Sequence, residues 1–165
     1  SVYNYVWQGN LISIDTLLSP QVQQDLLPSI LNQGTYKGRL YSVGTFDSGL
    51  GLYGRRSRLI AAGVRIPKGN QDAWTDEEFN QALAALAKQD PDRQVLDLKL
   101  NSRGEWYSYA FLPLIYSAGG RPNPAAVDRW LKSPSAIFAM QQVQGWIQNG
   151  YVDPNLDDAS FASGR

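Results

Sequence analysis

Carboxylates, hydroxyls, lysines and arginines are the side chains that could do chemistry in this chain, because its 165 residues include neither cysteine nor histidine. That absence excludes disulfides, thiolate nucleophiles, Cys/His zinc sites and Ser-His-Asp catalysis. Asp47 lies in a glycine-flanked turn after a short predicted strand, and Glu105 opens an aromatic segment. Two carboxyl groups at the right separation suffice for glycoside hydrolysis, so this pair is one candidate catalytic site. Asp47 alone could instead bind a ligand from its loop, or bond its own turn backbone.

Aromatic side chains are a second group of residues that could bind a ligand. The chain has 5 Trp, 9 Tyr and 5 Phe, and two short segments hold several of them: Tyr3, Tyr5 and Trp7, and then Trp106, Tyr107, Tyr109 and Phe111. An aromatic ring offers an apolar face that suits the C–H face of a sugar, whose hydroxyl edge needs polar partners. The alternative is that most of these rings pack in a core. We assign Trp74 and Trp146 to packing, because each lies on a clear helical pattern.

Charge and composition restrict the possible partners. Fifteen basic and fifteen acidic residues give a formal net charge of zero, which argues against nucleic acid and favours a neutral ligand. A hydrophobic content of 43% is typical of a globular protein. No apolar run is long enough to predict a membrane span. The glycine-rich stretch 47–53 lacks phosphate-loop spacing, and the sequence predicts no cofactor and no metal site.

The elements that must position these residues are mostly helical. Helix starts are predicted at Ser19-Pro20, at Thr75 through a capping box with Glu78, and at Ser133-Pro134. Further predictions are a break at Pro28, a helix over 55–62 ended by Gly63, a helix over 105–118 kinked near Pro113, and strands over 40–43 and 95–100. In the last helix, one face is predicted to carry Ile137, Met140, Val143 and Ile147. The predicted fold class is therefore helix-rich α/β.

Several segments, in this order, resemble the extracellular solute-binding proteins of ABC sugar importers, the maltose-binding-like group. They are 9–15 (GNLISID), 36–43 (YKGRLYSV), 59–64 (LIAAGV), 74–79 (WTDEEF), 111–114 (FLPL) with 119–120 (GG), 144–146 (QGW), 149–154 (NGYVDP) and 161–165 (FASGR). The sequence departs from the usual pattern at Gly44, where proline is common, and at Gly54, where asparagine is common.

This resemblance implies a type II periplasmic-binding-protein-like fold with two lobes, of which the chain holds a part. Residues 1–46 would belong to the first lobe and residues 47–165 to the second, and the chain would be a piece of a longer protein. By position, Asp47 matches a polar ligand-contacting residue at the crossover between lobes, and Tyr109 matches a stacking aromatic residue. Trp106 and Tyr107 are neighbouring candidates.

The function implied by the resemblance is solute capture and not catalysis. A sugar or oligosaccharide would bind between the lobes, and the closed protein would deliver it to an ABC transporter permease outside the cytoplasmic membrane. Two alternatives from other classes stay open: a carbohydrate-active enzyme using Asp47 and Glu105, and a structural fragment whose aromatic residues are all buried.

Overall fold

The computed structural model describes residues 2–102, 104–121 and 123–154, and it divides the chain into two compact units, Ser1–Gly49 and Leu50–Arg165. We call these the first unit and the second unit. Asp47, which the resemblance assigns to the second lobe, belongs to the first unit.

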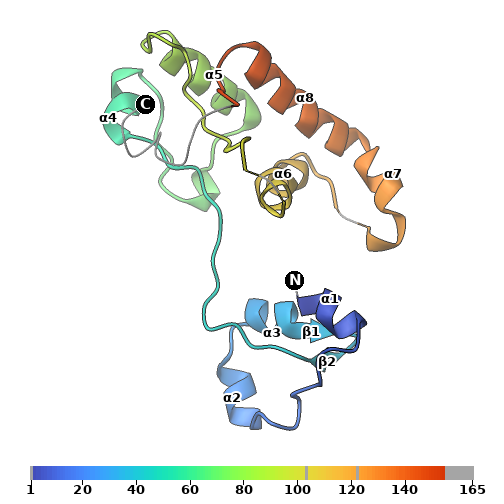
Figure 1. Ribbon diagram of the computed structural model, residues 1–165. Coiled ribbons are helices and arrows are strands. Elements are labelled where there is room, and N and C mark those ends of the chain that lie inside the picture. Colours follow the sequence, from blue (N-terminus) through green and yellow to red (C-terminus); the bar gives the residue numbers. More distant parts are fainter. Residues whose placement is uncertain (1, 103, 122, 155–165) are drawn as a thin grey trace. The chain divides into compact units, whose positions relative to one another are not determined.

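The first unit consists of short helices and one small hairpin (Figure 1). Its elements are α1 (Val2–Trp7), α2 (Pro20–Asp25), α3 (Pro28–Gly34), β1 (Thr35–Tyr36) and β2 (Arg39–Leu40). The predicted helix start is confirmed, because the Ser19 side chain accepts a hydrogen bond from the Val22 N–H. The predicted break at Pro28 is also confirmed, since α2 ends at Asp25 and Pro28 begins α3. Ile30 and Leu40 are the buried apolar side chains here.

The predicted strand over 40–43 is wrong beyond Leu40. The antiparallel ladder pairs Thr35 with Leu40 and Tyr36 with Arg39, and no strand continues it. The reason is a competing partner: the Tyr41 N–H donates to the Gly34 carbonyl at 2.9 Å, so the chain bonds the end of α3. Lys37 and Gly38 make the hairpin turn, both with positive φ, at 49° and 76°. Two-residue hairpin turns of this kind favour Asn, Asp or Gly.

The regular elements of the second unit's described part are all helices, and non-helical segments connect them. Its elements are α4 (Arg56–Ala61), η1 (Asn70–Asp72), α5 (Asp76–Ala87), α6 (Trp106–Ser117), η2 (Pro124–Ala126), α7 (Val127–Leu131) and α8 (Pro134–Gln148). The Thr75–Glu78 capping box and the Ser133 N-cap are both confirmed. Gly63 follows α4 with a φ of +69°, as its predicted stop role requires. α4 packs on α5, and α8 packs on both α6 and α7 (Figure 1).

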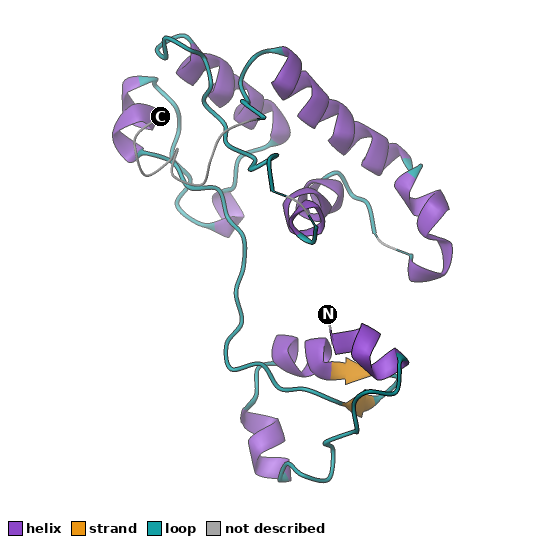
Figure 2. Cartoon of the chain, viewed as in Figure 1, coloured by secondary structure: helices purple, strands orange, loops and turns teal. Residues whose placement is uncertain are grey.

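The predicted strand over 95–100 is not formed. Figure 2 shows the two strands of the described residues in the hairpin of the first unit alone. The N–H groups of Val95 and Leu96 both donate to the Tyr151 carbonyl, at 3.0 and 2.9 Å, and no described strand lies beside them. The apolar alternation nevertheless gave the right burial, because Leu96 is in the core and Leu98 and Leu100 pack against it.

The buried face of α8 agrees with the predicted one at Val143 and differs from it at the other three positions. Its buried residues are Ala136, Ala139, Val143 and Trp146, whereas Ile137, Met140 and Ile147 are 39–48% exposed. The physical reason is close helix packing: Ala136 and Ala139 form one buried cluster with Ile115 of α6, and small side chains permit that approach. A second cluster contains Trp146, Leu83 and Val143. The chain is thus helix-rich, and the two-lobed α/β architecture stays a prediction.

Candidate functional site

The aromatic segment predicted to bind a ligand forms the first half of α6. Residues three, four or seven apart share a helix face, so Trp106 and Tyr109 lie on the same side as Pro113 and Tyr116. The opposite sides are used for packing: Phe111 and Leu114 contact the cluster around Trp146. The helix is therefore held by its apolar faces and leaves one aromatic face outside the core.

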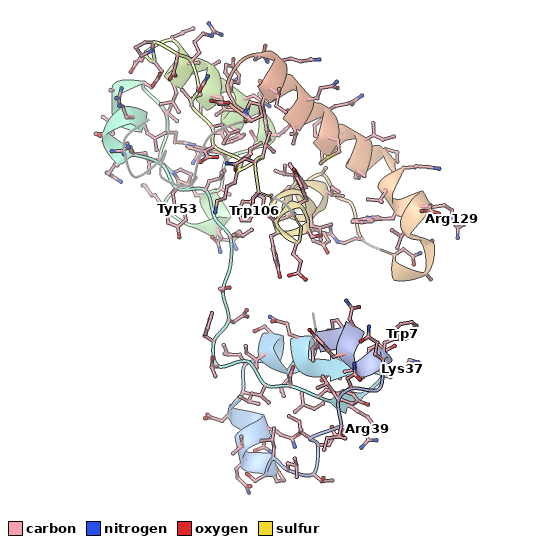
Figure 3. All side chains as sticks on the ribbon, in the orientation of Figure 1. Trp7, Lys37, Arg39, Tyr53, Trp106 and Arg129 are labelled. Carbon is pink, nitrogen blue, oxygen red and sulfur yellow. The ribbon has the colours of Figure 1, made fainter. Side chains whose placement is uncertain are left out.

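Trp106 is fixed at the start of this face (Figure 3). Its Nε1 donates to the Leu98 carbonyl at 3.1 Å, and the Lys99 Nζ lies 5.5 Å from the ring centroid. Lys99 has a left-handed backbone, with a φ of +54°. A cation over an indole face is attracted by the ring quadrupole. The 98–99 segment therefore orients the indole and supplies a positive charge beside it.

Tyr109 is the most exposed ring of the predicted site, at 57%. Its hydroxyl lies 3.5 Å from Glu105 Oε2, one helical turn earlier, which is at the long limit for a hydrogen bond. The side chain is thus exposed, and a carboxylate lies near its hydroxyl. This arrangement offers a stacking platform with polar groups at its edge.

Tyr107 lies on a different face from Tyr109, because residues two apart do not face the same way on a helix. Its hydroxyl donates to the Leu100 carbonyl at 3.0 Å, and its ring stacks on Phe111 at 5.7 Å with an interplanar angle of 12°. Tyr107 is thus engaged with its own unit, although 43% of it is exposed. Trp106 and Tyr109 therefore share one face of α6, and Tyr107 lies on another.

Asp47 is exposed in the first unit, where several donors surround its carboxylate. Oδ1 accepts from Gln33 Nε2 at 3.2 Å and from the Ser48 N–H at 2.9 Å. Hydrogen bonds from Ser29, then from Gln33 and Ser48, lower the pKa of Asp47 below its ordinary value of 3.8. Asp47 is therefore an ionised acceptor near neutral pH. The other predicted carboxylate, Glu105, belongs to the second unit, so each of the two carboxylates lies in its own unit.

A titration tests the environment of Asp47. We expect its carboxyl resonance to titrate with a midpoint below 3.8, and we expect Ser29→Ala to raise that midpoint. Because the pKa is lower in the folded than in the unfolded chain, these hydrogen bonds stabilise the first unit above the ordinary pKa. The stabilisation is lost as the pH falls through the folded value.

The matched control for that titration is Ser13→Ala. Ser13 is the main cause of the lowered pKa of Asp15, so this variant should move the Asp15 midpoint upward and leave Asp47 unchanged. A midpoint for Asp47 at or above its ordinary value, or no response to Ser29→Ala, would contradict the described hydrogen bonds.

The sequence did not assign a ligand site to the open cavity of the first unit. This cavity has a volume of about 390 Å³ and is lined by Val6, Trp7, Tyr36, Lys37, Arg39 and Tyr41. The clustering of Tyr3, Tyr5 and Trp7 was the available signal, but the sequence does not place α1 beside the hairpin. None of the donors to Asp47 lines this cavity.

Comparisons with protein-family models, curated proteins and solved structures gave no significant match to this chain. Within 2–102, 104–121 and 123–154, no three acidic side chains gather in a way that could hold a metal ion. Over the same residues, none of the helices has the length and apolar character that crossing a membrane requires.

Proposed function

We propose that this chain is part of the substrate-binding component of an ABC transporter, and that it binds a carbohydrate or similar neutral solute. One observation carries the proposal: α6 holds Trp106 and Tyr109 on a single face outside the core, with Lys99 and Glu105 beside them. A sugar ring needs an apolar platform and polar partners at its edge, and this face supplies both. The segments that resemble maltose-binding-like proteins add support from the sequence.

Asp47 has the chemistry of a hydroxyl-binding residue in this proposal. Its lowered pKa keeps it ionised and able to accept hydrogen bonds from sugar hydroxyls. A general acid for glycoside hydrolysis needs the opposite shift. These features favour a binding protein over the carbohydrate-active enzyme, and no observation on the described residues favours the enzyme.

The proposed mechanism is closure of the complete binding protein around its solute. A ligand that contacts both lobes stabilises the closed state only by its preference for that state. The closed protein would then present the solute to a permease on the outer side of the cytoplasmic membrane. Because this chain would supply only part of the contacts, we expect weak binding by the chain alone, in the millimolar range of about −4 kcal/mol and not the micromolar range.

The experiment is an NMR titration of the labelled chain with a panel of neutral mono- and oligosaccharides. We expect shift changes at Trp106 and Tyr109, and a loss of affinity of about two- to tenfold in Tyr109→Ala, the range that ring stacking supplies. Tyr53→Ala is the matched control, because Tyr53 is an 84% exposed tyrosine of the same unit that lies outside α6. The proposal fails if no neutral sugar perturbs α6, or if Tyr53→Ala weakens binding as much as Tyr109→Ala.

A further inference from the structure

The cavity of the first unit is built from two separate segments of the chain. Val6 and Trp7 come from the end of α1, and Tyr36, Lys37 and Arg39 come from the hairpin. Figure 3 shows Trp7, Lys37 and Arg39 on the same side of this unit. The volume of about 390 Å³ lies within the range of small-molecule sites.

The aromatic wall of the cavity is held in place by tertiary contacts. The Tyr3 hydroxyl donates to the Asn32 carbonyl at 3.2 Å, and the Tyr3 ring lies 5.9 Å from the Tyr36 ring. These contacts dock α1 on α3 and on the hairpin, and so they place Trp7. Trp7 itself is 77% exposed, which leaves a large apolar ring face available to a ligand.

The charged wall of the cavity carries an excess of positive charge. Arg39 Nε bonds Asp15 Oδ2 at 3.2 Å, so one of the two cations already has a carboxylate partner. The Lys37 Nζ lies 5.5 Å from the Tyr36 ring centroid, and none of the lining residues is acidic. The cavity therefore suits a ligand with a single negative charge.

The backbone conformation at Lys37 would favour asparagine or glycine over lysine. Its φ of +49° is in the left-handed region, at the first position of the hairpin turn. Asparagine or glycine adopts this conformation at a lower cost than a residue with a long side chain. Strain of this kind at the rim of a cavity motivates a functional role for the side chain that causes it.

We infer that this cavity binds a monoanionic sugar acid, with the carboxylate on Lys37 and the apolar ring face on Trp7. Tyr36, Tyr41 and Arg39 also line the cavity, and their side chains carry hydrogen-bonding groups that a hydroxylated ring could use. These groups suit a hydroxylated ring better than a bare aromatic acid. The site is separate from the face of α6, so the inference does not rest on the proposed function.

The test is calorimetry and NMR on the full chain with three probes: D-glucuronate, D-glucose and benzoate. We expect glucuronate to bind most tightly, about fivefold or more above glucose, because its carboxylate forms a charge-assisted hydrogen bond. Its shift changes should fall on the Trp7 indole and on the 36–41 backbone. Added salt should weaken glucuronate binding and leave glucose binding unchanged.

Two variants of Lys37 separate binding from folding. Lys37→Asn should weaken glucuronate binding about fivefold or more while the melting temperature of the first unit stays equal or rises. Lys37→Gln should weaken binding similarly without raising the melting temperature. The matched control is Arg93→Asn, which removes another cation with a left-handed backbone, at a φ of +65° in the second unit. Arg93→Asn should leave glucuronate binding unchanged.

The inference is overturned if glucuronate binds no better than glucose or benzoate, or if Lys37→Asn and Arg93→Asn bind it equally. It is also overturned if glucuronate perturbs α6 in place of the cavity, an outcome that leaves the proposed function intact. Conversely, glucuronate shifts at Trp7 that persist in Tyr109→Ala support the inference even if no neutral sugar binds α6.

Discussion

Replacing Trp146 with alanine should lower the free energy of unfolding of the second unit by about 3–5 kcal/mol, the cost of removing a large buried ring. Trp146 is 5% exposed and is one of the five buried residues of the larger core cluster. Its ring meets the Phe79 ring edge to face, with centroids 5.3 Å apart and planes at 79°. Alanine would leave a cavity where α5 and α8 meet.

The indole N–H of Trp146 contributes separately from its ring. Nε1 donates to Asn80 Oδ1 at 2.7 Å, and the Asn80 amide donates to Gln142 Oε1 at 2.9 Å and to the Asp76 carbonyl at 2.8 Å. Trp146→Phe keeps most of the apolar contact but removes this donor. The expected cost is about 1–3 kcal/mol, less than for alanine, because a part-buried acceptor loses its partner.

Both Trp146 variants are best measured by hydrogen exchange of the amides of α5 and α8 over a denaturant series. Trp7→Ala is the matched control, since it removes a tryptophan that is 77% exposed in the other unit and should leave these amides unchanged. A loss for Trp146→Ala of under about 1 kcal/mol, or an equal loss for both variants, would contradict the described packing.

Adding one methyl group at Gly34 is the second substitution with a large expected effect. A Cβ there would lie 1.9 Å from the Ser42 carbonyl oxygen and 3.1 Å from Leu40 Cδ1. The oxygen belongs to the backbone, so no side-chain rotation relieves the clash. Gly34→Ala should therefore force the end of α3 away from the chain after β2, at a cost of about 1–3 kcal/mol or more, as in other overpacked sites.

The matched control for Gly34→Ala is Gly49→Ala, because a Cβ at Gly49 has no atom within 4 Å. That control should be neutral, or stabilise by up to about 1 kcal/mol through the unfolded chain. Thermal melts followed by the amide signals of Tyr36 and Leu40 report on the hairpin directly. Equal melting of the two variants would rule out the close approach of Gly34 to Ser42.

Local signals in the sequence predicted the helix ends well, because a cap acts within one turn of its own residue. Ser19, Thr75 and Ser133 each accept the expected backbone N–H, and Gly63 takes the expected left-handed conformation. The 95–100 segment did not form the predicted strand, because a strand needs a partner strand, and that partner can be far away in the sequence. Its apolar residues are nevertheless buried or packed against the core, although the segment pairs with no strand of the described residues.

For the candidate site, too, local spacing predicts one part of the arrangement and tertiary packing determines the rest. The spacing of Trp106 and Tyr109 fixes a shared helix face, and the same geometry would have separated Tyr107. The exposure of Tyr109 and the packing of Tyr107 on Phe111 depend on how α6 meets the rest of its unit. The cavity beside Trp7 needed the docking of α1 on the hairpin, which no local pattern encodes.

Buried side chains are distributed unevenly between the two units, and this affects how cooperatively the chain unfolds. The second unit contains both apolar clusters, whereas the described part of the first unit buries Ile30 and Leu40 as its apolar side chains. Small domains with little buried surface are marginally stable. A melting curve recorded with one global probe would therefore mix two transitions and would not yield one thermodynamic constant.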